Sequence, residues 1–189
     1  MATQLQKKAK DFRLDYLVTG SWSQKASQEA LRLLGKDHVN VALDARKSSP
    51  NGKFTTIPAE STWQLSSDPA MVYLCENETV DGVEWPQFPQ CLEGRAADDK
   101  TIVVGDFSST ILSRPIPFNH FSIVFFGAQK NLGLPGITPV IIKKSLLAAL
   151  GQSTPDLARG VGFPVTPTIL DYSVMAKNNS LYNTLSIFE

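Results

Sequence analysis

The sequence lacks the features that mark several large classes of protein. Its 189 residues include only two cysteines, Cys75 and Cys91, too few for a disulfide framework and without metal-ligand spacing. Basic and acidic residues number 18 each, so no basic excess indicates a nucleic acid or a membrane partner. No apolar run approaches the ~20 residues that span a bilayer. Residues 1–8 contain no hydrophobic signal core, and a cytoplasmic location is expected.

Common catalytic signatures are also missing. The two histidines, His38 and His120, have no neighbouring nucleophile pattern, and they are too few for a histidine-based metal site. No Walker loop and no Gly-x-Gly-x-x-Gly motif is present. Glu76 and Glu78 alternate on an extended segment and therefore point to opposite sides, which argues against an acid–base pair of carboxylates.

Short apolar runs alternate with helical or loop-like segments along the chain. Helices are expected over residues 23–34, ended by Gly35, and over 144–150, ended by Gly151. The stretch 44–68 predicts an extended loop with a small hairpin near 53–57. Strands are expected as continuous apolar runs, typical of strands covered on both faces, over residues 14–19, 38–43, 70–74, 101–104, 121–126 and 138–142. The pattern predicts an α/β fold whose mostly parallel, doubly wound sheet has helices on both faces.

In such a sheet the ligand lies at the carboxyl ends of the strands, which makes the polar residues just past each strand the candidates. Lys130 follows an apolar strand, and a partly desolvated lysine can attack an aldehyde as a neutral amine. Asp106 ends another strand and could pair with a protonated pyridine nitrogen. The plainer alternative for Lys130 is a solvated lysine in a turn, and for Asp106 it is an Asx turn made with Ser108.

Four weaker candidates remain open between a binding role and an ordinary one. Trp22 could offer a flat face to a cofactor ring, or it could be a partly buried core residue. Thr79 could hydrogen-bond a cofactor oxygen or close the turn that Asn77 begins. Asn183 and Thr184 could bind phosphate or could be loop residues.

Five stretches, in the same order along the chain, resemble the phosphoserine aminotransferase family. Its members are class V aminotransferases of pyridoxal-phosphate (PLP) fold type I. The stretches are DYLVTGSWS at 15–23, CENETVDGVE at 75–84, GDFSSTILSRP at 105–115, GAQKNLG at 127–133 and NSLYNT at 179–184. Any one of them alone would be weak, but their number and order make the resemblance specific.

The resemblance implies a role for each candidate. Lys130 would bond PLP covalently and later move a proton, and Asp106 would hold the pyridine nitrogen protonated. The other contacts would be Trp22 on the ring face, Thr79 at the phenolic oxygen, Gln129 at the phosphate, and Asn183 and Thr184 at the phosphate of the neighbouring subunit's cofactor. A homodimer with a shared cofactor site is therefore implied.

The implied reaction moves an amino group from glutamate to 3-phosphohydroxypyruvate, giving phosphoserine and 2-oxoglutarate in serine biosynthesis. Family members also have an earlier Gly-rich phosphate loop and a later small domain. The resemblance thus implies a truncated form with little activity alone, divided into a helical lead-in at 1–14, a PLP-binding core at 15–177 and the start of a connecting segment at 178–189. Two alternatives stay open: another class V PLP enzyme, or a non-catalytic fragment that dimerises with or modulates a full-length relative.

Overall fold

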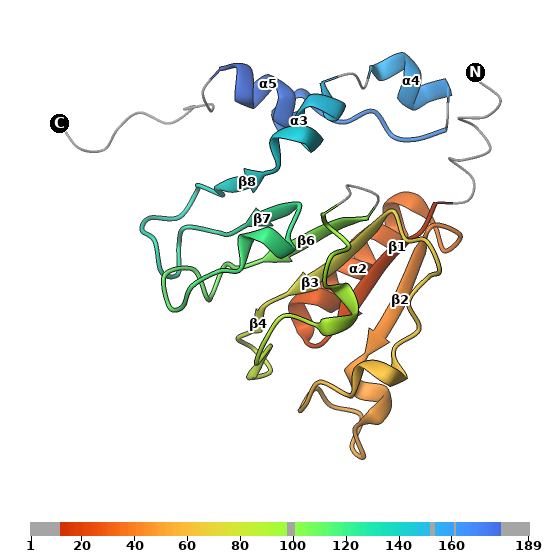
Figure 1. The fold of residues 1–189 in the computed structure, drawn as a ribbon, viewed down its shortest axis with the longest axis vertical. Helices are drawn as coiled ribbons and strands as arrows, with labels where there is room; N and C mark the ends of the chain where they lie inside the picture. The colour runs from red at the N-terminus through yellow and green to blue at the C-terminus, as the bar shows by residue number, and fades with distance from the viewer. Residues whose placement is uncertain (1–11, 98–100, 152–153, 161, 179–189) are drawn as a thin grey trace.

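The computed structural model describes residues 12–97, 101–151, 154–160 and 162–178. A six-stranded sheet forms its centre (Figure 1), in the order β2-β1-β3-β6-β7-β8. All neighbouring pairs from β2 to β7 are parallel, and β8 alone runs antiparallel to its neighbour β7. The strands are β1 (Leu14–Val18), β2 (Val39–Asp44), β3 (Met71–Cys75), β6 (Ile102–Asp106), β7 (Ile123–Phe125) and β8 (Val140–Ile142). The mostly parallel α/β sheet predicted from the apolar runs is confirmed.

Side chains alternate between the two faces of the sheet, and each face carries its own apolar cluster. Helix α2 (Ser21–Leu34) packs along β1 and β3 on one face. There its Ala30 belongs to a cluster with Tyr16, Val18, Tyr73 and Val104. The other face is covered by loops and the 3-10 helices η2 (Glu60–Thr62), η3 (Gln90–Leu92) and η4 (Phe118–His120), around a core that includes Leu17, Leu74, Val103, Val124, Trp63, Trp85, Leu92 and Phe107.

Helix α2 ends where the sequence predicts, at Gly35. This glycine has φ 81°, and its backbone N–H donates to the Leu31 carbonyl. A side chain is strained in that left-handed region, so glycine suits the position. The helix begins two residues before the predicted start, directly after Gly20.

The long connection after β2 differs from the prediction. Residues 53–57, all of them described, form no strand, and the hairpin expected there was wrong. A lone two-stranded hairpin is marginal in water, and the Asn51 side chain instead accepts from the Lys53 backbone N–H in a turn. The connection contains η1 (Ala45–Ser48) and is fastened to the sheet by the buried Asp15, which accepts from the backbone N–H and hydroxyl of Ser66.

A two-stranded hairpin does form elsewhere, between β4 (Asn77–Glu78) and β5 (Val83–Glu84). The remaining elements are α3 (Lys144–Leu150), α4 (Pro155–Gly160), η5 (Thr168–Leu170) and α5 (Tyr172–Lys177). Helices α3, α4 and α5 lie at the opposite end of the sheet from β4 (Figure 1). Among the described residues, no helix combines the length and the apolar character needed to cross a membrane.

Candidate active site

Four parallel strands end at one edge of the sheet, and the segments that follow them come together there. The first turn of α2, which follows β1, carries Trp22, and the β4–β5 hairpin after β3 carries Thr79. Strand β6 ends with Asp106, and the turn after β7 carries Gln129 and Lys130. The structure thus brings these five predicted residues to a single edge. The other two, Asn183 and Thr184, lie outside the described residues.

Lys130 contacts two of the predicted residues directly. Its Nζ donates a 3.1 Å hydrogen bond to Thr79 Oγ1 and lies 5.6 Å from the centre of the Trp22 ring. Because the Thr79 oxygen accepts from Lys130, the Thr79 hydroxyl proton stays free to be donated to another acceptor. An amine, a hydroxyl donor and an aromatic face therefore meet at one place.

A second lysine, which the sequence analysis did not single out, lies against the same aromatic ring. Lys25 Nζ is 4.6 Å from the centre of the Trp22 ring, one helical turn along α2. A cation over an exposed indole contributes about 0.5–1 kcal/mol. Trp22 lies just before the predicted helix of residues 23–34, so the three-residue spacing becomes a helical spacing only because α2 begins at Ser21. Trp22 itself is 41% exposed, so part of its ring remains available to a ligand.

Asp106 is held by a short chain of hydrogen bonds that reaches the lysine segment. Its Oδ1 accepts from the Ser108 backbone N–H at 2.9 Å and from the Ser108 hydroxyl at 2.5 Å. That hydroxyl in turn accepts from the Gly127 backbone N–H at 3.0 Å. Among the residues that the structure describes, Asp106 Oδ2 accepts no hydrogen bond. The Asx turn therefore exists, and it fixes the carboxylate while leaving one oxygen for a ligand.

Gln129 folds back over Gly127. A side-chain carbon built on Gly127 would lie 2.3 Å from Gln129 Oε1, so the glycine makes room for this amide. The arrangement places Gln129 beside the Asp106–Ser108–Gly127 hydrogen bonds. Its predicted contact with a phosphate stays a prediction.

Two acidic residues that sequence reasoning did not assign hold the start of α2. Glu78 is fully buried, and its two carboxylate oxygens accept from the backbone N–H groups of Trp22 and Ser23 at 2.8 and 2.9 Å. Asp81 accepts from the Ser21 N–H at 2.6 Å. Carboxylates are favourable at a helix start, where N–H groups lack partners within the helix. Trp22 is therefore tied to the hairpin that carries Thr79.

Gly20 is required for this close approach. A side-chain carbon there would lie 2.4 Å from Glu78 Cγ, inside the buried carboxylate side chain. A glycine before a helix offers no side-chain cap of its own, so the capping groups must come from elsewhere. The sequence shows that this cap is absent but does not indicate which residue replaces it.

At the base of the hairpin, Arg114 joins two glutamates. Its Nη2 donates to the Glu76 carboxylate and to the Trp85 carbonyl, the latter at 2.7 Å, and lies 3.3 Å from Glu84 Oε1. Burial raises the pKa of Glu76 to about 7, because desolvation outweighs the opposing Arg114 charge and the nearby Glu84 carboxylate adds to the rise.

The raised pKa predicts that Glu76 makes stability depend on pH. The folded pKa of about 7 exceeds the ordinary value of 4.5, so the folded state keeps a proton that the unfolded state releases. This stabilisation is complete below about pH 4.5 and is lost as the pH rises through about 7, with a total of roughly 3 kcal/mol. Urea unfolding of the wild type and Glu76→Gln should show the wild type losing that amount relative to the variant between pH 4.5 and 8. A difference that is constant with pH would contradict the prediction.

Cys75 lies next to the site but does not resemble a reactive thiol. It is 4% exposed, and burial together with the Asp106 charge raises the pKa of its thiol well above the ordinary value. A buried neutral thiol of this kind acts as a small apolar side chain.

Comparison with known proteins identifies the same family over the whole site. The class-V aminotransferase family matches residues 3–189. The chain is 48% identical to phosphoserine aminotransferase of Saccharomyces cerevisiae over 178 residues, 92% of this chain and 43% of the relative. It is 38% identical to the Delftia acidovorans phosphoserine aminotransferase, covering 90% of this chain and 41% of that protein. The chain therefore spans about two fifths of the length of these relatives.

Solved structures agree with the sequence matches. Phosphoserine aminotransferase from Bacillus circulans subsp. alkalophilus superposes with a TM-score of 0.70 at 36% identity, covering 97% of this chain and 45% of that one. A PLP-bound phosphoserine aminotransferase from Trichomonas vaginalis gives a TM-score of 0.64 at 35% identity, covering 97% and 46%.

Proposed function

Because the chain belongs to the class-V aminotransferase family, we propose that it forms the cofactor-binding part of an enzyme that transfers an amino group from glutamate to 3-phosphohydroxypyruvate. The products would be phosphoserine and 2-oxoglutarate. The relatives named phosphoserine aminotransferase support this choice of substrates. The homodimer, the cytoplasmic location and the division into a core at 15–177 with flanking segments stay predictions.

Class V aminotransferases depend on PLP, and the residues present suit this cofactor. The observation that carries the proposal is the meeting of Lys130 Nζ with Thr79 Oγ1 and the Trp22 ring at the carboxyl edge of the sheet. PLP has an aldehyde that an amine can attack, a phenolic oxygen that can accept a hydrogen bond from a hydroxyl group, and a flat ring that can stack on an aromatic side chain. These three groups are close together, and Asp106 supplies a carboxylate at the end of the next strand.

When bound, PLP supplies an electron sink for the negative charge that develops as the substrate loses a proton. The chain's own residues bind, orient and exchange protons. Asp106 Oδ2 would share a proton with the ring nitrogen, Thr79 would donate its hydroxyl proton to the phenolic oxygen, and Trp22 would fix the plane of the ring. Lys130 Nζ would take the proton from the substrate carbon and pass it to the cofactor.

The proposed function is tested with the full chain, PLP and glutamate. Borohydride reduction followed by peptide mass spectrometry should place the cofactor on Lys130 rather than spread it over the 189-residue chain's other lysines. Adding glutamate to the unreduced complex should then release 2-oxoglutarate in an amount limited by the bound cofactor. Labelling spread evenly over the lysines would contradict the assignment of Lys130 as the residue that bonds the cofactor. Labelling at Lys130 without 2-oxoglutarate would favour the non-catalytic alternative.

Asp106→Asn is expected to slow the glutamate reaction by about 100-fold or more, because the amide cannot balance a positive charge on the ring nitrogen. The amide oxygen can still accept from Ser108, so the fold should be retained. Single-turnover formation of 2-oxoglutarate measures the rate, and circular dichroism checks the fold. An unchanged rate in a folded variant would remove Asp106 from the proposed mechanism.

A further inference from the structure

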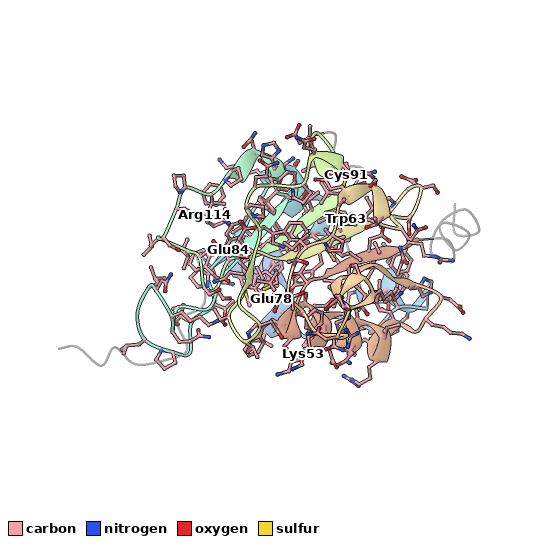
Figure 2. All side chains as sticks on the ribbon, turned by 90° about the horizontal axis from the view of Figure 1, so that it is seen from below. Lys53, Trp63, Glu78, Glu84, Cys91 and Arg114 are labelled. Atoms are coloured by element: carbon pink, nitrogen blue, oxygen red, sulfur yellow. The ribbon has the colours of Figure 1, made fainter. Side chains whose placement is uncertain are left out.

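The β4–β5 hairpin is fastened at both of its ends. At its tip, Glu78 and Asp81 hold the first turn of α2. At its base, Arg114 contacts Glu76, which precedes β4, and Glu84 and Trp85, the last residue of β5 and the one after it. Figure 2 labels Glu78, Glu84 and Arg114. Thr79 lies at the tip itself, between Glu78 and Asp81. The position of its hydroxyl therefore follows from the tip contacts directly, and from the base contacts through the two strands of the hairpin.

Arg114 also belongs to the segment that follows Asp106. It lies eight residues after that carboxylate, in a loop that Ser109 ties to the hairpin by donating its hydroxyl to the Asn77 carbonyl at 3.1 Å. A single guanidinium group thus connects the hairpin that carries Thr79 to the loop that fixes Asp106. No other charged side chain in the described part of the chain joins these two segments.

The contact gathers several acceptors around one nitrogen of the guanidinium group. Three acceptors converge on Nη2 of Arg114: the Glu76 carboxylate, the Glu84 carboxylate and the Trp85 carbonyl. The Glu76 side chain is only 10% exposed, so loss of the cation would make ionisation of this carboxyl group less favourable still and would remove the charge-assisted contact. A lysine would restore the charge and carries three donors on one nitrogen, so it should keep part of the contact, although its side chain differs from arginine in length and shape.

We propose that Arg114 is a positioning residue of the active site, which fixes the base of the β4–β5 hairpin and so holds Thr79 at its working distance from Lys130 and Asp106. The part of this inference that concerns the cofactor rests on the proposed function. The part that concerns the hairpin does not, because it can be measured without PLP.

The first test measures hydrogen–deuterium exchange in the full chain without cofactor. Arg114→Gln should raise the exchange rates of the amides in residues 77–85 by about tenfold or more, because a charge-assisted contact no longer opposes local opening. Arg46→Gln is the matched control. It breaks another partly buried Arg–carboxylate contact, with Asp44 at 2.8 Å, at the end of β2, and should leave residues 77–85 unchanged.

The second test is spectroscopic. In the PLP complex, the pH midpoint of the visible absorption band should shift in Arg114→Gln, because a hydrogen bond from Thr79 to the ring oxygen favours one protonation state. A loss of stability alone would not move this midpoint, so Arg46→Gln should keep the wild-type value. Arg114→Lys should lie between the wild type and Arg114→Gln. The milder Glu84→Gln, which removes one carboxylate that is 49% exposed, should raise hairpin exchange by about two- to threefold.

Distinct results decide between the proposals. Unchanged hairpin exchange in both Arg114→Gln and Glu84→Gln would overturn the positioning role, as would equal effects of Arg114→Gln and Arg46→Gln on residues 77–85. If Arg114→Gln does not fold, Arg114→Lys and Glu84→Gln decide by the same criteria. Faster hairpin exchange together with absent labelling at Lys130 in the wild type would uphold the hairpin attachment and reject the proposed function.

Discussion

Lys130→Ala should abolish covalent attachment of PLP and lower glutamate-dependent formation of 2-oxoglutarate by roughly 10⁴-fold or more. The methyl group of alanine can neither bond an aldehyde nor carry a proton between two carbon atoms. Lys130 is exposed, and its described contacts are the Thr79 hydroxyl and the Trp22 ring, so its loss should leave the fold intact. Borohydride labelling and single-turnover assays measure the two effects.

The matched control for Lys130 is Lys25→Ala. Lys25 also places an ammonium group over Trp22, at a shorter distance of 4.6 Å, so the control removes the same kind of charge from the same ring. It should keep the covalent label at position 130. Equal loss of labelling in the two variants would mean that positive charge near Trp22, rather than the amine of Lys130, holds the cofactor.

Glu78→Ala should lower the free energy of unfolding by about 3 kcal/mol or more. The substitution leaves the N–H groups of Trp22 and Ser23 without their acceptors beside a buried cavity. Glu78→Gln keeps an acceptor oxygen without the charge and should fall between the alanine variant and the wild type. Urea unfolding monitored by circular dichroism measures the differences.

Asp171→Ala provides the comparison for Glu78. Asp171 caps α5 in a similar way, accepting from the backbone N–H groups of Ser173 and Val174, but it is only partly buried, whereas Glu78 is fully buried. Water can replace its hydrogen bonds, so the loss of stability should be clearly smaller. An Asp171→Ala effect as large as that of Glu78→Ala would show that burial of Glu78 is not what makes its cap important.

The sheet could be predicted because each central strand is buried on both faces, and burial leaves a continuous apolar run in the sequence. The residues at 71–75 and 102–106 illustrate this, since the predicted and observed strands nearly coincide. The rule that ligands lie at strand ends then located Lys130, Thr79 and Asp106. Strand β7 is shorter than the predicted 121–126, because Phe121, Ser122 and Phe126 lie outside the paired residues although both phenylalanines are apolar.

The supporting contacts could not be predicted in this way. Glu78 and Trp22 are 56 residues apart, and Arg114 and Glu76 are 38 apart. No local pattern encodes such pairings, because they exist only after the strands have paired. Glu76 and Glu78 do take different partners, in keeping with the alternation expected of an extended segment, but those partners became visible only in the folded chain.

The first turn of α2 restricts how an anionic ligand can lie in the site. Free N–H groups at the start of a helix commonly hold phosphate. Here Glu78 and Asp81 already occupy three of them with two negative charges. A phosphate near this turn would meet electrostatic repulsion. A ligand with one anionic end would therefore be favoured with that end away from α2, so this turn would set the ligand's orientation without binding its charge.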